Sequence, residues 1–181
     1  MNECYQIKSA GELSEKEIER IVDAWSIPEY NDLTKVDFAE RFSYSEFHLL
    51  YYGDSISALA RINFDFELEM EGVKYKFAEL VGLVAVEKQK GRGTQLVKLI
   101  MQNMVERNIQ AIGFCEKSLR GFYIRCELRI FEGKAKYLLE YVESKWIPST
   151  DDDILEINLS SANRLLFESL NQNNPAFLYL A

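Results

Sequence analysis

The chain has little of what covalent or metal frameworks need: it contains three cysteines and one histidine among 181 residues. Cys4, Cys115 and Cys126 lack metal-ligand spacing, so we expect no disulfide framework, no zinc site and no metal cofactor. His48 lies among strand aromatics, where a packed or surface role is expected and not catalysis, and a Cys–His acyl relay has little support from the sequence. Few cysteines without a pairing pattern are typical of a reducing compartment, and we expect a cytoplasmic protein.

Long apolar runs and an excess of positive charge are also missing. No run approaches the roughly 20 residues that cross a membrane, so no membrane partner is expected. The chain carries 21 Lys and Arg against 29 Asp and Glu, a net charge of −8. This balance argues against nucleic acid as a partner and favours a cationic small-molecule substrate. The length suits one domain with a sizeable core.

What the chain does have is a distinctive central stretch. Residues 80–86 form a short apolar run rich in β-branched residues, which predicts a strand buried on both faces. A polar loop with two glycines follows at 88–93, and apolar residues at helical spacing then predict an amphipathic helix that starts near Thr94. The order strand, glycine loop, helix points backbone N–H groups and the positive end of the helix dipole at an anion. We therefore expect a phosphate-bearing ligand here.

Two common phosphate motifs do not fit this loop. The dinucleotide fingerprint needs a third glycine where Leu96 stands, and the Gly-Lys-Ser/Thr of a Walker loop is absent. The segment Lys88-Gln89-Lys90-Gly91-Arg92-Gly93 instead resembles the acetyl-CoA motif of the GNAT acetyltransferase superfamily, Gln/Arg-x-x-Gly-x-Gly/Ala, with Lys88 in place of the first residue. A glycine turn before an ordinary helix is the alternative.

The remaining pattern predicts an α+β chain. Capping signals at Ser14 and Thr34 predict two early helices, the first ended by Pro28. Gly53-Asp54 joins two runs that predict a hairpin, and Glu71-Gly72 joins an alternating strand to Val73–Val86, a strand long enough to bend or bulge near its middle. Strands are further predicted at 5–8, 111–115, 128–131 and 154–159, and helices at 118–125 and 162–170. This order resembles the GNAT fold, a mixed, mostly antiparallel sheet with flanking helices, as a single domain over residues 1–181.

The resemblance implies acetyl-CoA as co-substrate and a set of residues that bind it. The strand before the loop would hold the pantetheine arm through its backbone, as an added strand does. The loop amides would hold the pyrophosphate, and basic side chains would add charge. The cofactor-binding residues implied in this way are Leu83, Val84, Ala85, Val86, Lys88, Lys90, Gly91, Arg92, Gly93 and Thr94.

Two residues are candidates for catalysis. The segment around Tyr123 resembles the superfamily's aromatic-Tyr, three residues, Gly-Phe pattern, with Glu127 replacing the usual glycine. A phenol with a pKa of about 10 is close to a CoA thiol and suits a general acid for the leaving thiolate; a tyrosine packed on the sheet is the alternative. Glu79 resembles the catalytic glutamate of the histone-acetylating branch, and partial burial would raise its pKa towards that of a useful base. A solvated glutamate is the alternative there.

An acidic segment, Asp151-Asp152-Asp153, precedes the last predicted strand. Adjacent carboxylates repel each other and need water or cations nearby. A proline, this run and a final strand in the same order resemble the aminoglycoside 2′-N-acetyltransferases. The resemblance implies that Asp152, together with Asp151, holds substrate amines; an exposed acidic loop is the alternative.

Together these features predict an acetyl-CoA-dependent N-acetyltransferase that acts on a small cationic amine, with an aminoglycoside-like amino sugar as the finer hypothesis. Glu79 would take the amine proton and Tyr123 would protonate the sulfur within a ternary complex. A peptide or protein N-acetyltransferase and a non-catalytic CoA-binding module are the rivals. The resemblance also leaves a homodimer open.

Overall fold

The computed structural model describes residues 3–86, 88 and 90–179, and the chain divides into two compact units. The first unit comprises Met1–Phe64 and Leu80–Ile100, and the second comprises Asp65–Glu79 and Met101–Ala181. Strands β3 (Ser55–Met70) and β4 (Val73–Ala85) and helix α3 (Arg92–Glu106) contribute residues to both units. The single domain expected from the sequence stays a prediction.

The sheet of the first unit is antiparallel. Strand β1 (Glu3–Ser9) pairs with β2 (Ser45–Tyr52), which pairs with the first half of β3. The turn between β2 and β3 contains Gly53 with φ of 61°, a left-handed conformation that glycine adopts without strain. The predicted hairpin and the predicted first strand are therefore confirmed.

Two capped helices precede this hairpin. Helix α1 (Glu15–Trp25) begins with a capping box between Ser14 and Glu17, and α2 (Lys35–Arg41) begins with one at Thr34, as the sequence predicts. Helix α1 ends at Trp25 with Ser26 left-handed at φ of 54°, two residues before Pro28, as expected for a helix ended by that proline. Short 3-10 helices span Ala10–Glu12 and Pro28–Tyr30.

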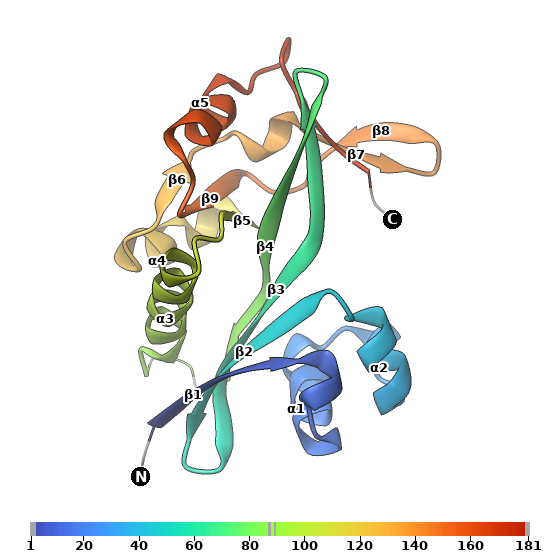
Figure 1. Ribbon diagram of the computed structural model, residues 1–181, viewed down its shortest axis with the longest axis vertical. Coiled ribbons are helices and arrows are strands. Elements are labelled where there is room, and N and C mark those ends of the chain that lie inside the picture. Colours follow the sequence, from blue (N-terminus) through green and yellow to red (C-terminus); the bar gives the residue numbers. More distant parts are fainter. Residues whose placement is uncertain (1–2, 87, 89, 180–181) are drawn as a thin grey trace. The chain divides into compact units, whose positions relative to one another are not determined.

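The core of the first unit lies between these helices and the sheet (Figure 1). The Phe38 ring of α2 lies 5.4 Å from the Phe47 ring of β2 and 4.6 Å from that of Phe42. Burial of such rings is the dominant favourable contribution to folding. The main buried members of this core are Ile18, Ile21, Val22, Phe38, Phe42, Phe47, Leu49 and Leu59.

The second unit holds a mixed sheet in the order β6-β9-β5-β4-β3-β10-β7-β8. β10 runs parallel to β7, and the pairs β5–β9, β6–β9, β7–β8 and β10–β3 are antiparallel. The predicted mixed, mostly antiparallel sheet with flanking helices is therefore confirmed. The further elements of this unit are β5 (Ala111–Cys115), β6 (Arg129–Phe131), β7 (Leu138–Val142), β8 (Lys145–Pro148), β9 (Asp153–Ile157), β10 (Ala176–Leu178), α4 (Arg120–Arg125), α5 (Ser161–Ser169) and 3-10 helices at Lys117–Leu119 and Ala135–Tyr137.

A second aromatic core stabilises this sheet. The fully buried Phe167 of α5 lies 5.4 Å from the Phe77 ring and 5.6 Å from the Phe131 ring. The strands at 111–115, 128–131 and 154–159 and the helices at 118–125 and 162–170 are found close to their predicted bounds. Strands β7, β8 and β10 are missing from the sequence prediction.

None of the helices within the described residues is long and apolar enough to span a membrane.

Candidate functional site

Strand β4 is irregular at Gly82. This glycine has φ of 63° within an otherwise extended strand, an irregularity that lies closer to the strand's end than to the middle, where the sequence predicts a bend or bulge. The indole Nε1 of Trp25, the last residue of α1, donates a hydrogen bond of 2.8 Å to the Gly82 carbonyl. A Cβ atom at position 82 would lie 2.6 Å from that Nε1. Both the backbone conformation and the indole therefore require glycine here.

The end of β4 is less buried than its apolar sequence predicts. Leu80 is buried, but residues 81–86 are all partly accessible, so the strand is confirmed while its burial on both faces is wrong. The physical reason is that three of these residues, Val81, Gly82 and Val84, line a pocket. Beyond β4, the Val86 amide donates to the Ser57 carbonyl at 2.9 Å. The pantetheine-binding role of 83–86 stays a prediction.

The pocket beside Gly82 has a volume of about 240 Å³. Three aromatic rings meet edge-on in its wall, with ring centroids separated by 5.6 Å for Tyr30–Phe42, 5.7 Å for Trp25–Phe42 and 5.9 Å for Trp25–Tyr30. The guanidinium carbon of Arg61 lies 5.1 Å above the Phe42 ring. We call this the aromatic pocket; it is lined by Trp25, Ile27, Tyr30, Phe42, Arg61, Val81, Gly82 and Val84.

Sequence reasoning missed the aromatic pocket. Trp25 had the helical spacing of an ordinary core residue, and Tyr30 and Arg61 carried no recognisable motif. The one available signal was the isolated glycine inside an apolar strand, which indicates a bulge or a close approach of another group.

The glycine loop leads into α3 as the motif requires. Gly91 has φ of 72° with open space around an added Cβ, so its conformation and not crowding calls for glycine. Its carbonyl accepts the amide of Gln95 at 3.0 Å, which begins the helix. Gly93 is buried and Thr94 is partly buried, while Lys88 and Lys90 are exposed. Gln89 of the motif lies outside the described residues.

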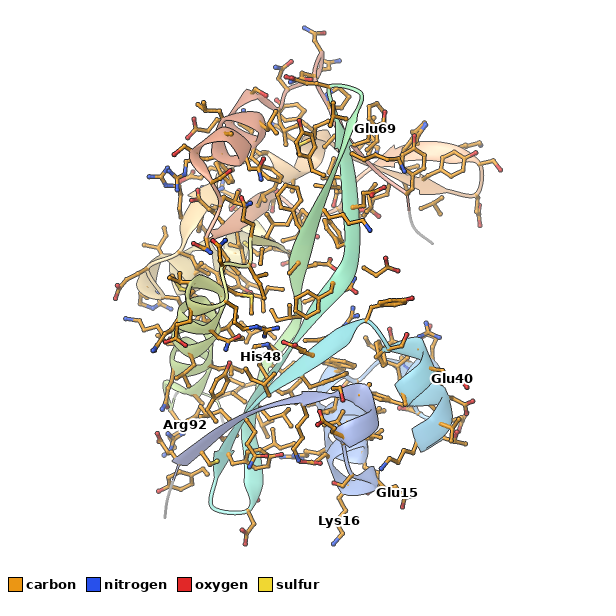
Figure 2. The ribbon with its side chains drawn as sticks, viewed as in Figure 1. Glu15, Lys16, Glu40, His48, Glu69 and Arg92 are labelled. Atoms are coloured by element: carbon orange, nitrogen blue, oxygen red, sulfur yellow. The ribbon has the colours of Figure 1, made fainter. Side chains whose placement is uncertain are left out.

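Arg92, which is labelled in Figure 2, lies in the first turn of α3. Its side chain already has partners within the first unit. Its guanidinium forms an ion pair with Glu3 of β1 and lies 4.5 Å from the ring centroid of Tyr52. Gln95 donates to the other oxygen of Glu3 at 2.7 Å. The Glu3 carboxylate neutralises the charge of Arg92, which the positive end of the helix dipole disfavours at a helix N-terminus. The phosphate-binding role of Arg92 stays a prediction, and it would have to coexist with Glu3.

Tyr123 belongs to the second unit, on α4, and is 7% exposed. Burial, followed by the nearby Cys115, Cys126 and Asp151, raises the pKa of its phenol to about 12. The phenol is therefore neutral at physiological pH and holds the proton that a general acid must give. The same burial also fits the alternative of a packed tyrosine.

Glu127 occupies a conformation that glycine normally takes. It has φ of 68° directly after α4, and the following amide, that of Leu128, donates to the Tyr123 carbonyl at 3.2 Å. This is the hydrogen bonding of a helix end that closes on a left-handed residue. The chain therefore keeps the local turn around Tyr123 although a glutamate replaces the glycine of the family pattern.

Cys115 and Cys126 are buried. Burial, with added repulsion from Asp153, raises the pKa of the Cys115 thiol to about 11. A thiol with so high a pKa is a poor nucleophile at neutral pH, in keeping with a packing role.

Two of the three acidic side chains at 151–153 are bound within their own unit. Asp153 is fully buried and accepts hydrogen bonds from Arg120 Nε at 2.7 Å, Arg120 Nη2 at 2.8 Å and the Gly133 amide at 2.7 Å. Burial alone would raise the pKa of Asp153. The hydrogen bonds from Arg120 and Gly133 have the larger combined effect and hold this pKa below its ordinary value. Asp152 accepts the Lys117 amide at 2.7 Å. Their carboxylates therefore hold the unit's own backbone and Arg120.

Asp151 differs from its neighbours. Its side chain is partly buried and accepts no hydrogen bond from the residues that the structure describes. Burial, together with the nearby carboxylates of Glu140 and Glu116, raises its pKa. The substrate-binding roles predicted for Asp151 and Asp152 stay predictions. Of the two, Asp151 is the residue whose carboxylate can accept a hydrogen bond from a substrate amine without breaking an existing one.

Glu79 is partly buried in β4 and belongs to the second unit. Its role as base stays a prediction, as does the expected absence of a metal. The predicted site residues thus fall into two groups: the β4 end, the loop and the start of α3 in the first unit, and Glu79, Tyr123, Asp151 and Asp152 in the second.

Solved structures share this fold. An acetyltransferase from Bacillus subtilis in complex with CoA matches 88% of this chain and 100% of its own, at 14% identity and a TM-score of 0.57. A GNAT family acetyltransferase from Elizabethkingia anophelis with acetyl-CoA bound matches 87% of this chain and 99% of its own, at 18% identity and a TM-score of 0.51. The protein therefore has the GNAT acyl-CoA N-acyltransferase fold.

Other comparisons add no further assignment. A probable N-acyltransferase from Enterococcus faecalis matches 66% of this chain at 12% identity and a TM-score of 0.47, and the chain spans only 32% of that protein's length. No protein-family model and no curated protein matches the sequence.

Proposed function

We propose that this protein transfers the acetyl group of acetyl-CoA to the primary amine of a small acceptor. One observation carries the proposal: β4 contains the left-handed Gly82, and the left-handed Gly91 directly precedes α3, within the GNAT fold. Solved proteins of this fold have CoA or acetyl-CoA bound. A glycine turn that opens a 15-residue helix offers backbone N–H groups and a positive dipole end to a diphosphate.

The proposed cofactor contacts follow from this geometry. The backbone of Leu83–Val86 binds the pantetheine arm, and the amides from Lys90 to Thr94 bind the diphosphate. Exposed Lys88 and Lys90 add positive charge at the loop. Arg92 contributes its backbone amide in the first helical turn, because its guanidinium is already paired with Glu3.

The proposed chemistry is a direct attack within a ternary complex. The amine nitrogen attacks the thioester carbonyl carbon, an N–C bond forms and the C–S bond breaks. Glu79 accepts the proton that the amine loses, and Tyr123 donates its phenolic proton to the departing thiolate. Burial keeps the Tyr123 phenol protonated at neutral pH, as this role requires, but its pKa of about 12 also makes proton transfer to the thiolate less favourable than from an ordinary phenol with a pKa of about 10.

The acceptor is proposed to be a small amine that is cationic in water, and a reducing cytoplasm is the proposed location. An aminoglycoside-like amino sugar is the finer proposal for the acceptor. Its support is Asp151, whose carboxylate has acidic neighbours and accepts no hydrogen bond from the described residues. Asp152 and Asp153 support it less, since both carboxylates are already bound.

Calorimetry with CoA and a thiol-release assay with acetyl-CoA test this function. We expect CoA to bind, and Gly91→Val to abolish binding because a β-branched residue is strained at φ of 72°. Gly11→Val is the matched control, since Gly11 also has open space but no left-handed conformation. Binding without thiol release for any amine would indicate a CoA-binding module, and release with peptides alone would indicate a peptide acetyltransferase. No binding of CoA would overturn the proposal.

A further inference from the structure

The aromatic pocket shares a wall with the strand proposed to hold acetyl-CoA. Val81, Gly82 and Val84 line the pocket, and the proposed pantetheine-binding backbone begins at Leu83. An acceptor amine has to reach the acetyl carbonyl beside this backbone for the reaction to occur. The pocket is therefore in a position to hold the part of the acceptor that does not react.

The lining of this pocket is suited to an apolar group. Trp25, Tyr30 and Phe42 contribute rings, and the aliphatic side chains of Ile27, Val81 and Val84 complete the wall. Among the residues that the structure describes, the only charged side chain in the lining is the guanidinium of Arg61, so these residues offer no carboxylate to an ammonium group. An ammonium placed there would lose hydration without gaining an opposite charge.

The aromatic rings do not form a vacant cage for a cation either. Aromatic faces can bind ammonium groups when the faces are accessible. Here the guanidinium of Arg61 lies over the Phe42 ring at 5.1 Å, and that of Arg41 lies over the Tyr30 ring at 4.9 Å. Two of the three rings therefore already contact a cation, and a second cation would be repelled.

The volume sets the size of the group. An apolar cavity of about 150 Å³ takes up benzene, and this pocket has about 240 Å³. It therefore admits one aryl ring with a short alkyl chain, or a branched alkyl group of similar size. The rings of an amino sugar are too polar for this lining.

We propose that the aromatic pocket binds the aryl or branched-alkyl body of a small primary amine, so that amphipathic monoamines are better acceptors than polycationic amino sugars. This inference rests on the proposed acetyl transfer, because it takes Leu83–Val86 as the strand that holds acetyl-CoA, and it replaces the aminoglycoside-like acceptor with an amine that has an apolar body. The amine nitrogen lies towards that strand and the apolar body contacts the rings.

Turnover with a panel of amines is the first test. The panel contains 2-phenylethylamine and isoamylamine as amphipathic monoamines, and spermidine and kanamycin as polycations, each with acetyl-CoA. We expect kcat/KM to be about tenfold or more higher for the monoamines. Ile27→Glu, at a position already 37% exposed, should lower kcat/KM for 2-phenylethylamine about tenfold and raise it for spermidine. Val36→Glu is the matched control: Val36 is 65% exposed and outside the lining.

A binding measurement separates this inference from the proposed function. The chain has two tryptophans, so a Trp146→Phe background leaves Trp25 as the only indole. Quenching of its fluorescence by 2-phenylethylamine, lost in Ile27→Glu and kept in Val36→Glu, supports the pocket's ligand class even where no acetyl transfer occurs. Preferred turnover of kanamycin or spermidine that Ile27→Glu does not change would overturn the inference and keep the function. The inference would also be overturned if 2-phenylethylamine caused no quenching and no monoamine were turned over.

Discussion

The aromatic pocket of the first unit and the acidic segment 151–153 of the second unit differ in how their side chains are used. In the acidic segment, Asp153 and Asp152 bind Arg120 and backbone amides of their own unit. In the aromatic pocket, the rings of Trp25, Tyr30 and Phe42 line an accessible cavity. A run of charges is conspicuous in a sequence, yet its partners decide whether it can bind anything else. Aromatic residues that belong to no motif can form the more accessible site.

The largest expected effect tests the structural role of the acidic segment. Asp153→Asn removes the buried carboxylate that pairs with Arg120, which then keeps only Glu132 as a charged partner, and we expect the free energy of unfolding to fall by about 3 kcal/mol. Urea denaturation followed by circular dichroism measures it. Because the pKa of Asp153 is lower in the folded state, its carboxylate stabilises the protein above the unfolded pKa. This stabilisation is lost as the pH falls through the folded pKa. The difference between wild type and variant should therefore shrink in acid. An unchanged urea midpoint at neutral pH would show that the acidic segment has no structural role.

The next effect tests what the second unit contributes to chemistry. Tyr123→Phe removes the proposed proton donor, and we expect kcat to fall about hundredfold while the Kd of CoA stays within about twofold. Since the pKa of Tyr123 is about 12, wild-type activity should show no alkaline loss from this group below about pH 10. Steady-state rates and calorimetry measure both, with Tyr44→Phe, at a site 66% exposed, as control. Equal activity of the Tyr123→Phe variant would assign this tyrosine to packing alone.

A smaller effect tests the wall of the aromatic pocket. Gly82→Ala places a Cβ 2.6 Å from the Trp25 indole at φ of 63°. Strain and the weakened indole hydrogen bond should together lower the free energy of unfolding by about 2 kcal/mol. Gly11→Ala, with nothing within 4 Å of its Cβ, should change it far less. Similar urea midpoints for the two variants would mean that the indole does not fix this strand.

The smallest expected effect has the opposite sign. The folded pKa of Asp151 is raised, so the ionised carboxylate disfavours the folded state once pH exceeds the unfolded pKa. Asp151→Asn should therefore stabilise the protein at pH 7 by less than about 1 kcal/mol, and the gain should disappear as pH falls below the unfolded pKa. Thermal unfolding at pH 7 and pH 3 measures the difference. Destabilisation at pH 7 would indicate that this carboxylate has a structural partner as its neighbours do.

Much of the fold could be predicted from the sequence because local signals set it. The capping boxes at Ser14 and Thr34 and the turns at Gly53 and Gly72 act within a few residues, and each is found where the sequence predicts it. Strands β7, β8 and β10 could not be predicted in this way. They are short, and β10 pairs with β3 and β7, which are distant in sequence.

The candidate site was predictable where it depends on backbone and not where it depends on convergence. Gly91 and the start of α3 follow from a local motif. The hydrogen bond from Trp25 to Gly82 and the pairing of Glu3 with Arg92 join residues far apart in the chain, and no periodicity indicates such pairs. The burial predicted for residues 80–86 failed for the same reason, since an apolar run does not say whether its neighbours leave a cavity.

The contact between the indole of Trp25 and Gly82 also constrains how this protein can evolve. A side chain at position 82 would collide with the indole ring, so a smaller residue has to replace Trp25 first. In the reverse order, the first substitution would give a protein of lower stability. Even then the left-handed backbone restricts position 82 to glycine or, at some cost, asparagine. The two positions should therefore vary together among descendants of this chain, and a change of acceptor preference through the tryptophan becomes accessible before any change in the strand.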